Sequence, residues 1–213
     1  VPLLTRSLRQ LSHLGVKKVI LVVGYRSEMF QDHYGSSYMG MDIHYVFNPD
    51  WSTTNNLVSF DLANPLIDTD YILLEGDLIY TEDAIGRMNC INSMAVAPLE
   101  THMDGTVVTI NEDHLVKTMY LKSNKTKYQA SDLLYKTVNI YCFSLSSHIN
   151  VVQPEVKHLL DRGAYQSYYE EAFAQAIKKQ TLAMKAVSFV DQLWYEIDTP
   201  EDFEKAKDLF RDE

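Results

Sequence analysis

The run Val19-Ile20-Leu21-Val22-Val23 decides the fold class of this sequence. A strand that leaves one face in water alternates apolar and polar side chains, whereas these residues are all apolar and mostly β-branched. Such a run is typical of a strand in a parallel sheet that is covered on both faces. Gly24 and Tyr25 follow the run and end the predicted strand.

The elements around this run alternate between helix and strand. Apolar residues at helical spacing, or in short runs bounded by Gly, Pro and Asn, predict helices over residues 2–14, 26–34 and 57–63 and strands over residues 42–47 and 71–74. Strands that alternate with helices form βαβ units, in which successive strands are parallel. The first half of the chain therefore predicts a Rossmann-like parallel sheet.

The second half of the chain departs from this alternation. Its apolar runs predict strands over residues 94–98, 106–110, 114–121, 136–143, 183–189 and 194–197, and helices around residues 156–160, 169–177 and 200–210. Two of these strands form a hairpin around residues 111–113. We expect one α/β domain over residues 1–213, a three-layer Rossmann-like mixed sheet with antiparallel additions in its second half.

The composition is that of a folded, acidic domain. Hydrophobic residues make up 46% and charged residues 23% of the 213 residues, and the formal net charge is −10. Lys and Arg form no cluster, which argues against a nucleic-acid partner because nucleic acids bind to basic patches. An anionic substrate would need a metal ion to be held against this negative field.

The cysteine content and the hydropathy of the sequence predict where in the cell the protein is found. Cys90 and Cys142 are too few for a disulfide framework or a zinc site, and free thiols suit a reducing compartment. The sequence contains no apolar run of about 20 residues, the length of a membrane span, and no recognisable signal peptide. We therefore predict a cytoplasmic location and no membrane partner.

Two acidic residues stand where ligands bind in an open α/β sheet, beyond the carboxyl ends of strands. Asp77 follows the strand at 71–74, and Gly76 before it lets a ligand approach the backbone. Asp198 follows the short strand at 194–197. Mg²⁺ takes oxygen ligands, commonly one or two carboxylates plus substrate phosphates. We hypothesise that the two acids hold Mg²⁺; the alternative makes each a turn or helix-cap residue in water.

Several segments, in their order along the chain, carry a resemblance to a known family. They are Val-Val-Gly-Tyr at 22–25, Thr-Asn-Asn-Leu-Val-Ser at 54–59, Leu-Glu-Gly-Asp at 74–77, Met-Asp-Gly-Thr at 103–106, Lys-Thr-Val-Asn-Ile-Tyr at 136–141 and Trp-Tyr-Glu-Ile-Asp-Thr-Pro at 194–200. Together they resemble the sugar-phosphate nucleotidyltransferases, and within them the phosphocholine and aminoalkylphosphonate cytidylyltransferases. The resemblance covers essentially the whole chain.

The resemblance implies a fold, a reaction and roles for particular residues. The fold is that of the nucleotide-diphospho-sugar transferases. The reaction transfers CMP from CTP to a phosphocholine- or phosphonate-type acceptor and releases pyrophosphate. Asp77 and Asp198 would be catalytic metal ligands, and the residues around the nucleotide would be Gly24, Tyr25, Asn55, Asn56 and Ser59. Helix capping is an equally weighted alternative for Asn55.

The acceptor site implied by the resemblance is less specific. Lys136 would contact the acceptor's phosphate as a catalytic positive charge, with a solvated strand-edge lysine as the alternative. Trp194, Tyr169 and Tyr168 would form part of an aromatic cage for an ammonium group, helped by Glu196 or Glu170. Core packing is the favoured alternative for Tyr169. Asp104 would face the acceptor's amine or sit in a turn.

One element of the family pattern is not in this sequence. Family members carry a glycine-rich loop, followed by Pro-Lys, upstream of the stretch that residues 1–4 resemble, and that loop holds the triphosphate. We therefore expect a domain truncated at its N-terminus.

The cytidylyltransferase activity has three alternatives. They are a sugar-1-phosphate nucleotidyltransferase, a non-catalytic nucleotide-binding module of the same fold, and a nucleotide-sugar glycosyltransferase. The sequence is compatible with a homodimer.

Overall fold

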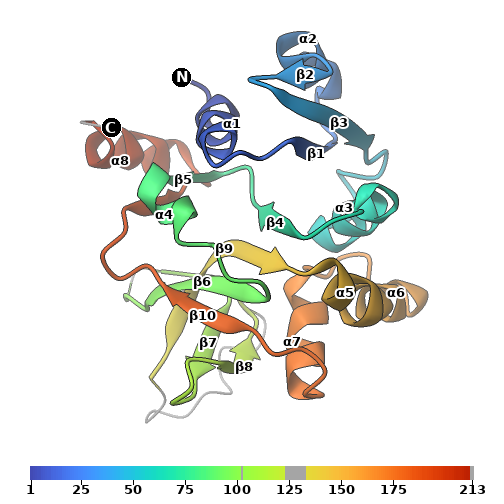
Figure 1. Ribbon diagram of the computed structural model, residues 1–213, viewed down its shortest axis with the longest axis vertical. Helices are drawn as coiled ribbons and strands as arrows, with labels where there is room; N and C mark the ends of the chain where they lie inside the picture. Colours follow the sequence, from blue (N-terminus) through green and yellow to red (C-terminus); the bar gives the residue numbers. More distant parts are fainter. Residues whose placement is uncertain (102, 123–132, 212–213) are drawn as a thin grey trace.

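The computed structural model describes residues 1–101, 103–122 and 133–211, whose strands form three sheets with helices packed around them (Figure 1). The strands are β1 (Lys18–Val23), β2 (Ser37–Tyr38), β3 (Met41–Phe47), β4 (Tyr71–Leu74), β5 (Leu78–Tyr80), β6 (Ser93–Pro98), β7 (Val107–Ile110), β8 (Val116–Tyr120), β9 (Tyr135–Phe143), β10 (Lys185–Ser188) and β11 (Trp194–Glu196). The helices are α1 (Leu3–His13), α2 (Ser27–Tyr34), α3 (Asn56–Ala63), α4 (Glu82–Gly86), α5 (Leu145–Ser147), α6 (Gln153–Asp161), α7 (Glu170–Lys178) and α8 (Pro200–Leu209). The predicted mixed α/β class is confirmed.

The first sheet is built as the sequence predicts. Strand β1 pairs in parallel with β3 along its whole length, from Lys18 opposite Asp42 to Val23 opposite Phe47. Helix α2 connects the two strands, and the short strand β2 adds an antiparallel edge. Gly15, after α1, takes a φ of +81°, which glycine adopts without steric cost.

The larger sheet contains the antiparallel additions. Its order is β10-β6-β9-β7-β8, with β4 also paired to β9, and β10 is parallel to β6. The predicted hairpin is confirmed, because β7 and β8 pair antiparallel. A separate pair, β5 with β11, lies next to α8 (Figure 1).

The prediction that β4 continues the parallel sheet of β1 is wrong. Strand β4 pairs antiparallel with β9, with Leu74 opposite Ile140, and in the described chain no strand lies between β1 and β4. All six residues of β1 are only half-buried, so the predicted covering of both faces is not reached either. The apolar side chains of both strands instead face a cavity of about 980 Å³, called the inter-sheet cavity below.

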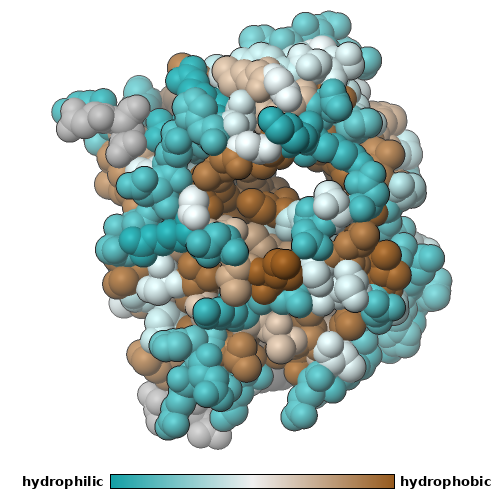
Figure 2. Space-filling model, in the orientation of Figure 1, coloured by the Kyte–Doolittle hydropathy of each residue, from teal (hydrophilic) through white to brown (hydrophobic). Residues whose placement is uncertain are grey.

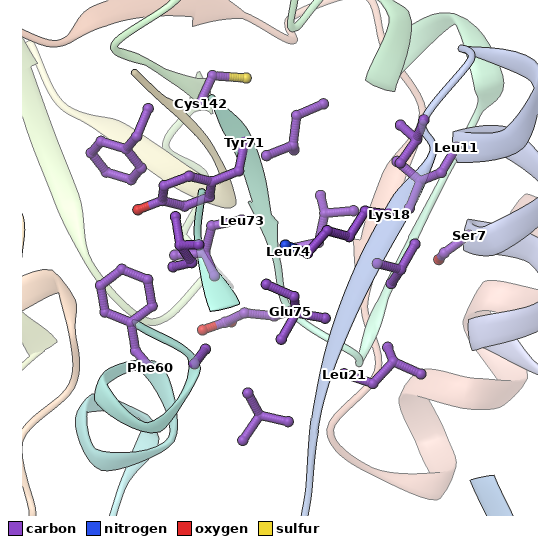
Figure 3. A pocket seen from close by; sticks show the side chains of 18 of the residues that line it. Ser7, Leu11, Lys18, Leu21, Phe60, Tyr71, Leu73, Leu74, Glu75 and Cys142 are labelled. Carbon is purple, nitrogen blue, oxygen red and sulfur yellow. The ribbon is translucent and has the colours of Figure 1, made fainter. Parts of the chain in front are cut away.

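The inter-sheet cavity is hollowed from the face drawn in Figure 2, where hydrophobic residues line it. In the close view, Leu11 and Leu21 approach it from the side of α1 and β1, and Leu73 and Phe60 from the side of β4 and α3 (Figure 3). Glu75, which follows β4, brings a carboxylate to the wall.

Two hydrophobic cores lie on opposite faces of the large sheet. One is formed by α3, α6 and α7 against β6–β9 and includes Tyr169 and Phe173. The other is formed by α1, α4 and β5 and includes Leu8 and Phe189. The two cores share the strands β6 and β9, whose alternating side chains point to both.

Helix α8 begins with the predicted cap. The Thr199 hydroxyl accepts from the Asp202 N–H, and the Asp202 carboxylate accepts from the Thr199 N–H, a complete capping box. Ala206 and Phe210 are buried, whereas Phe203, at the same helical spacing, is 49% exposed with its ring beneath Lys207 Nζ. Since Thr199 performs the capping, Asp198 is left for another role.

Candidate active site

Asp77 and Asp198 are brought together by the strand pair β5–β11. Asp77 directly precedes β5, and in the antiparallel register Leu78 lies opposite Glu196. The Ile197 N–H donates to the Asp77 carbonyl oxygen at 3.0 Å. Both acids line a second cavity of about 990 Å³, the acidic cavity, whose other acidic lining residues include Glu75, Glu170 and Glu196.

The Asp77 carboxyl group is buried and only partly satisfied by hydrogen bonds. Burial raises the pKa of this carboxyl group, and the nearby Asp198 carboxylate also raises it. Asp77 Oδ1 is buried and receives no hydrogen bond from the described residues. An acceptor in that state is costly unless a proton or a cation satisfies it.

The described residues, 1–101, 103–122 and 133–211, contain no group of three or more His, Cys, Asp or Glu that could hold a metal ion. Asp77 and Asp198 alone would hold a cation only if a substrate supplied its remaining ligands. Mg²⁺ binds in this way when one or two carboxylates and the phosphates of a nucleotide share it.

Lys136 is a buried cation in the wall of the acidic cavity. The alternative of a solvated strand-edge lysine is wrong, since Lys136 is 1% exposed. Its Nζ donates to the Thr137 carbonyl oxygen at 2.8 Å and to Glu196 Oε1 at 3.2 Å. Gly105 makes room for it: a Cβ on that residue, whose φ is +106°, would lie 3.0 Å from Lys136 Nζ. In the Met-Asp-Gly-Thr segment, it is thus Gly105 that packs against the Lys136 side chain.

Glu75 stands between the two cavities and lines both. Its Oε1 accepts from the Tyr169 hydroxyl at 2.6 Å and from Asn56 Nδ2 at 3.2 Å, and its Oε2 accepts from Asn139 Nδ2 at 2.8 Å. Burial raises the pKa of Glu75 to about 7, although the Tyr169 hydrogen bond opposes the shift. Glu75 therefore links α3, the N-cap residue of α7 and β9 at one point.

The predicted nucleotide residues divide into two groups. Asn55, Asn56 and Ser59 line the inter-sheet cavity. Gly24 lies at the end of β1 instead, where a Cβ would come within 2.5 Å of the Trp51 side chain, so only glycine fits. Tyr25 beside it is 61% exposed, with its ring 5.4 Å from that of Trp51.

The polar atoms of the first group are largely engaged within the protein. Asn55 caps α3, with its side chain accepting from the Asn56 N–H at 2.8 Å, so the capping interpretation is confirmed. Asn56 bonds to Glu75 and, through Oδ1, to the Tyr169 N–H. Ser59 accepts from Asn48 Nδ2 at 3.0 Å. Each end of the Asn56 amide makes one hydrogen bond within the protein, so the amide keeps one donor hydrogen and one acceptor lone pair for a ligand.

The predicted acceptor residues meet at the acidic cavity, with one exception. Trp194, Glu196, Asp104 and Lys136 line it, and Asp104 pairs with Lys122. Tyr169 as a substrate-binding ring is wrong: it is 3% exposed and packs against Phe60, Tyr141 and Phe173 in the core. The half-exposed Tyr168 lines both cavities instead.

Two residues of the cavity were not identified as site residues from the sequence, Glu75 and Asn139. The polar Asn139 interrupts an otherwise apolar stretch of β9, between Val138 and Ile140, and that interruption is the signal that could have found it. Glu75 carries no comparable signal, because an acid after a strand is common in turns.

Comparisons with known proteins agree with this fold. The chain matches no family model. It is 35% identical, across 96% of its length and 33% of the relative's, to the CMP-5'-(3-aminopropyl)phosphonate synthase of Streptomyces rubellomurinus. The chain is thus similar in sequence to enzymes named for nucleotidyl transfer. It spans about a third of the length of the curated relatives that it matches.

Solved nucleotidyltransferases share the fold at low sequence identity. The inositol-1-phosphate CTP transferase from T. maritima superimposes with a TM-score of 0.73 at 18% identity, over 97% of this chain and 81% of that one. The CTP:phosphocholine cytidylyltransferase from Streptococcus pneumoniae has a TM-score of 0.73 at 17% identity, over 98% and 85%. The nucleotide-diphospho-sugar transferase fold expected from the resemblance is confirmed.

Among the residues that the structure describes, no helix combines the length and the apolar character needed to cross a bilayer.

Proposed function

We propose that this chain is a nucleotidyltransferase that transfers CMP from CTP to a phosphonate- or phosphocholine-type acceptor and releases pyrophosphate. The observation that carries the proposal is the meeting of Asp77, Asp198 and Lys136 at one cavity. The relative named a CMP-5'-(3-aminopropyl)phosphonate synthase supports cytidine as the base and a phosphonate as the acceptor.

In this reaction an acceptor oxygen attacks the α-phosphorus of CTP. The bond from that phosphorus to the bridging oxygen breaks, and pyrophosphate leaves with that oxygen. Asp77 and Asp198 would hold Mg²⁺, which when bound neutralises phosphate charge. Lys136 would bind an acceptor oxygen, since it is a fixed cation at the cavity wall. Phosphoryl transfer depends mainly on such positioning and charge neutralisation.

The proposal is tested by pyrophosphate release from the purified protein in CTP and Mg²⁺, with 3-aminopropylphosphonate, phosphocholine or glucose 1-phosphate as acceptor. We expect release with CTP and an amino- or choline-bearing acceptor, and loss of release in EDTA. Release with UTP and glucose 1-phosphate alone would contradict the proposal.

A sugar-1-phosphate nucleotidyltransferase is the second candidate. A stretch of 79 residues, 37% of this chain, is 33% identical to the UTP–glucose-1-phosphate uridylyltransferase AglF of Haloferax volcanii. The acidic lining of the second cavity favours the first candidate, because carboxylates attract an ammonium-bearing acceptor more than a neutral sugar.

We also propose a cytoplasmic location. Both cysteines are free, and Cys142 is buried in the core, as in proteins of a reducing compartment. Labelling of the protein in fractionated cells would test this.

A further inference from the structure

Asn139 has a backbone conformation that is unusual inside a strand. Its φ is +59°, and among the described residues it is the one non-glycine residue with positive φ inside a named strand. Non-glycine residues avoid this region, and Asn tolerates it better than most. The conformation therefore calls for a reason in the surroundings.

The strand is irregular at the same place. Opposite β6, the register shifts between Met94, which faces Tyr141, and Val96, which faces Thr137. On its other edge, β9 pairs with β4 from Ile140 onward and with β7 through Lys136 and Tyr135. Asn139 thus lies where β9 changes partners, and a bulge there re-aims a side chain.

The side chain of Asn139 points to two carboxylates and uses its full hydrogen-bonding capacity. Nδ2 donates to Glu75 Oε2 at 2.8 Å and to Glu196 Oε1 at 2.7 Å. Oδ1 accepts from the Thr137 hydroxyl at 3.0 Å and from the Tyr141 hydroxyl at 3.4 Å. An amide offers two donor hydrogens and two acceptor lone pairs, and all four are matched.

One of these carboxylates also holds the buried lysine. Glu196 Oε1 receives both Asn139 Nδ2 and Lys136 Nζ. The Glu75 and Glu196 carboxyl groups interact unfavourably with one another, and Glu196 also interacts unfavourably with Asp77 and Asp198. A donor that bonds to both carboxylates keeps them near each other in spite of this repulsion.

We infer that Asn139 is a positioning residue: its amide holds Glu75 and Glu196 side by side and, through Glu196, fixes Lys136 Nζ at the acidic cavity. Glycine accepts the same φ but has no amide, and aspartate would place a third carboxylate against the other two. Asn combines the backbone conformation with the required donor. The catalytic consequence rests on the proposed function.

The variant Asn139→Gly separates the amide from the backbone, because glycine keeps the left-handed conformation. We expect a folded protein whose kcat falls about tenfold to a hundredfold, the effect of losing a hydrogen bond to charged groups, with the KM for CTP changed less than about threefold. Asn92→Gly is the matched control: Asn92 has a φ of +53°, and its side chain bonds to Ser147 and Ser144 away from the cavity. It should leave kcat unchanged.

A double-mutant cycle tests whether Asn139 acts through Glu196. In a Glu196→Gln background, Asn139→Gly should lower kcat by less than about threefold, because the arrangement that it supports is already lost. Full additivity of the two substitutions, or a kcat of Asn139→Gly equal to that of the unchanged protein, overturns the inference.

A crystal structure of Asn139→Gly gives a readout that does not depend on activity. We expect Lys136 Nζ to leave its place beside Glu196 and the two carboxylates to separate. An unmoved Nζ and unmoved carboxylates overturn the inference. If the unchanged protein releases no pyrophosphate, the proposed function fails, and the crystal structure still decides the role of Asn139.

Discussion

The two cavities of this molecule are nearly equal in volume and opposite in chemistry. The acidic cavity, of about 990 Å³, is lined by side chains that bond to one another, among them Lys136, Asn139 and Glu196. The inter-sheet cavity, of about 980 Å³, is lined mainly by apolar side chains of β1, β4 and α1. They meet at Glu75, Asp77 and Tyr168, which line both.

The two cavities therefore differ in what a substitution in their lining disturbs. In the acidic cavity the buried charged side chains have hydrogen-bonded neighbours, except at Asp77 Oδ1 and Glu170 Oε2. A substitution there therefore changes the positions of the neighbouring charged groups. In the inter-sheet cavity, apolar residues of β1 remain half-buried, so a substitution there removes little packing. The predictions below set one cavity against the other.

The largest effect is expected for Asp77→Asn and Asp198→Asn. Loss of a metal-binding carboxylate weakens charge neutralisation by roughly 4 kcal/mol, about a thousandfold in kcat/KM. The measurement is the rate of pyrophosphate release. Asp191→Asn is the matched control, an exposed acid paired with Arg87 outside the cavity. If both site variants keep an activity within a few-fold of that of the parent, Asp77 and Asp198 take no part in the reaction.

Leu8→Ala and Leu21→Ala should differ in their cost to stability. Leu8, on α1, borders the inter-sheet cavity but is fully buried in the core, and its truncation should lower the free energy of unfolding by about 3 kcal/mol. Leu21 is half-buried beside the inter-sheet cavity and should cost about 1 kcal/mol. Urea denaturation measures both. Equal losses would show that the inter-sheet cavity is filled in solution.

Gly105→Ala should cost more than Gly40→Ala. Both glycines have positive φ, so each alanine brings backbone strain of about 1–2 kcal/mol. A Cβ at Gly40 meets open space, whereas one at Gly105 presses on Lys136 Nζ, which adds about 1 kcal/mol. Thermal unfolding compares the two. We also expect a lower kcat in Gly105→Ala alone; the same kcat in both variants would contradict the placement of Lys136.

The smallest effect concerns the pH dependence of stability through Glu75. Its pKa is about 7 in the folded protein and near 4.5 when unfolded, so the folded state binds the proton more tightly. On this account stability falls as pH rises from about 4.5 to 7 and is then constant. Glu75→Gln should make this fall in the free energy of unfolding smaller by about 1 kcal/mol. The effect is small because solvent screens this half-buried group. The difference between the unfolding curves of parent and variant in EDTA isolates it; parallel pH profiles would contradict the shift.

Much of the fold was predictable from local patterns. The elements around residues 18–23, 56–63, 71–74 and 200–209 appear within a few residues of their predicted bounds, because periodicity and capping residues act locally. The partner of β4 was not predictable, since β9 lies about 70 residues further along the chain. Helical spacing alone does not fix how wide the buried stripe of a helix is: Phe203 is exposed although Ala206 and Phe210 are buried.

The two acids of the site were predictable from the sequence, whereas the residues that hold the site together were less so. Asp77 and Asp198 follow from their positions at strand ends, and the structure brings them to one cavity. The resemblance implies a substrate role for Tyr169, whereas its ring packs in the core, which is the alternative that the sequence favours. Asn139 and Glu75 act through contacts between distant segments, which a sequence pattern does not display.

The central claim, that Asp77 and Asp198 share a divalent cation with the nucleotide, is tested most directly by electron paramagnetic resonance with Mn²⁺ in place of Mg²⁺. In the presence of CTP, the unchanged protein should reduce the signal of free Mn²⁺ below that of Mn²⁺ and CTP alone. Asp77→Asn/Asp198→Asn should leave that signal at the level without protein. If the double variant binds Mn²⁺ and CTP as tightly as the parent, the two acids are not the metal site.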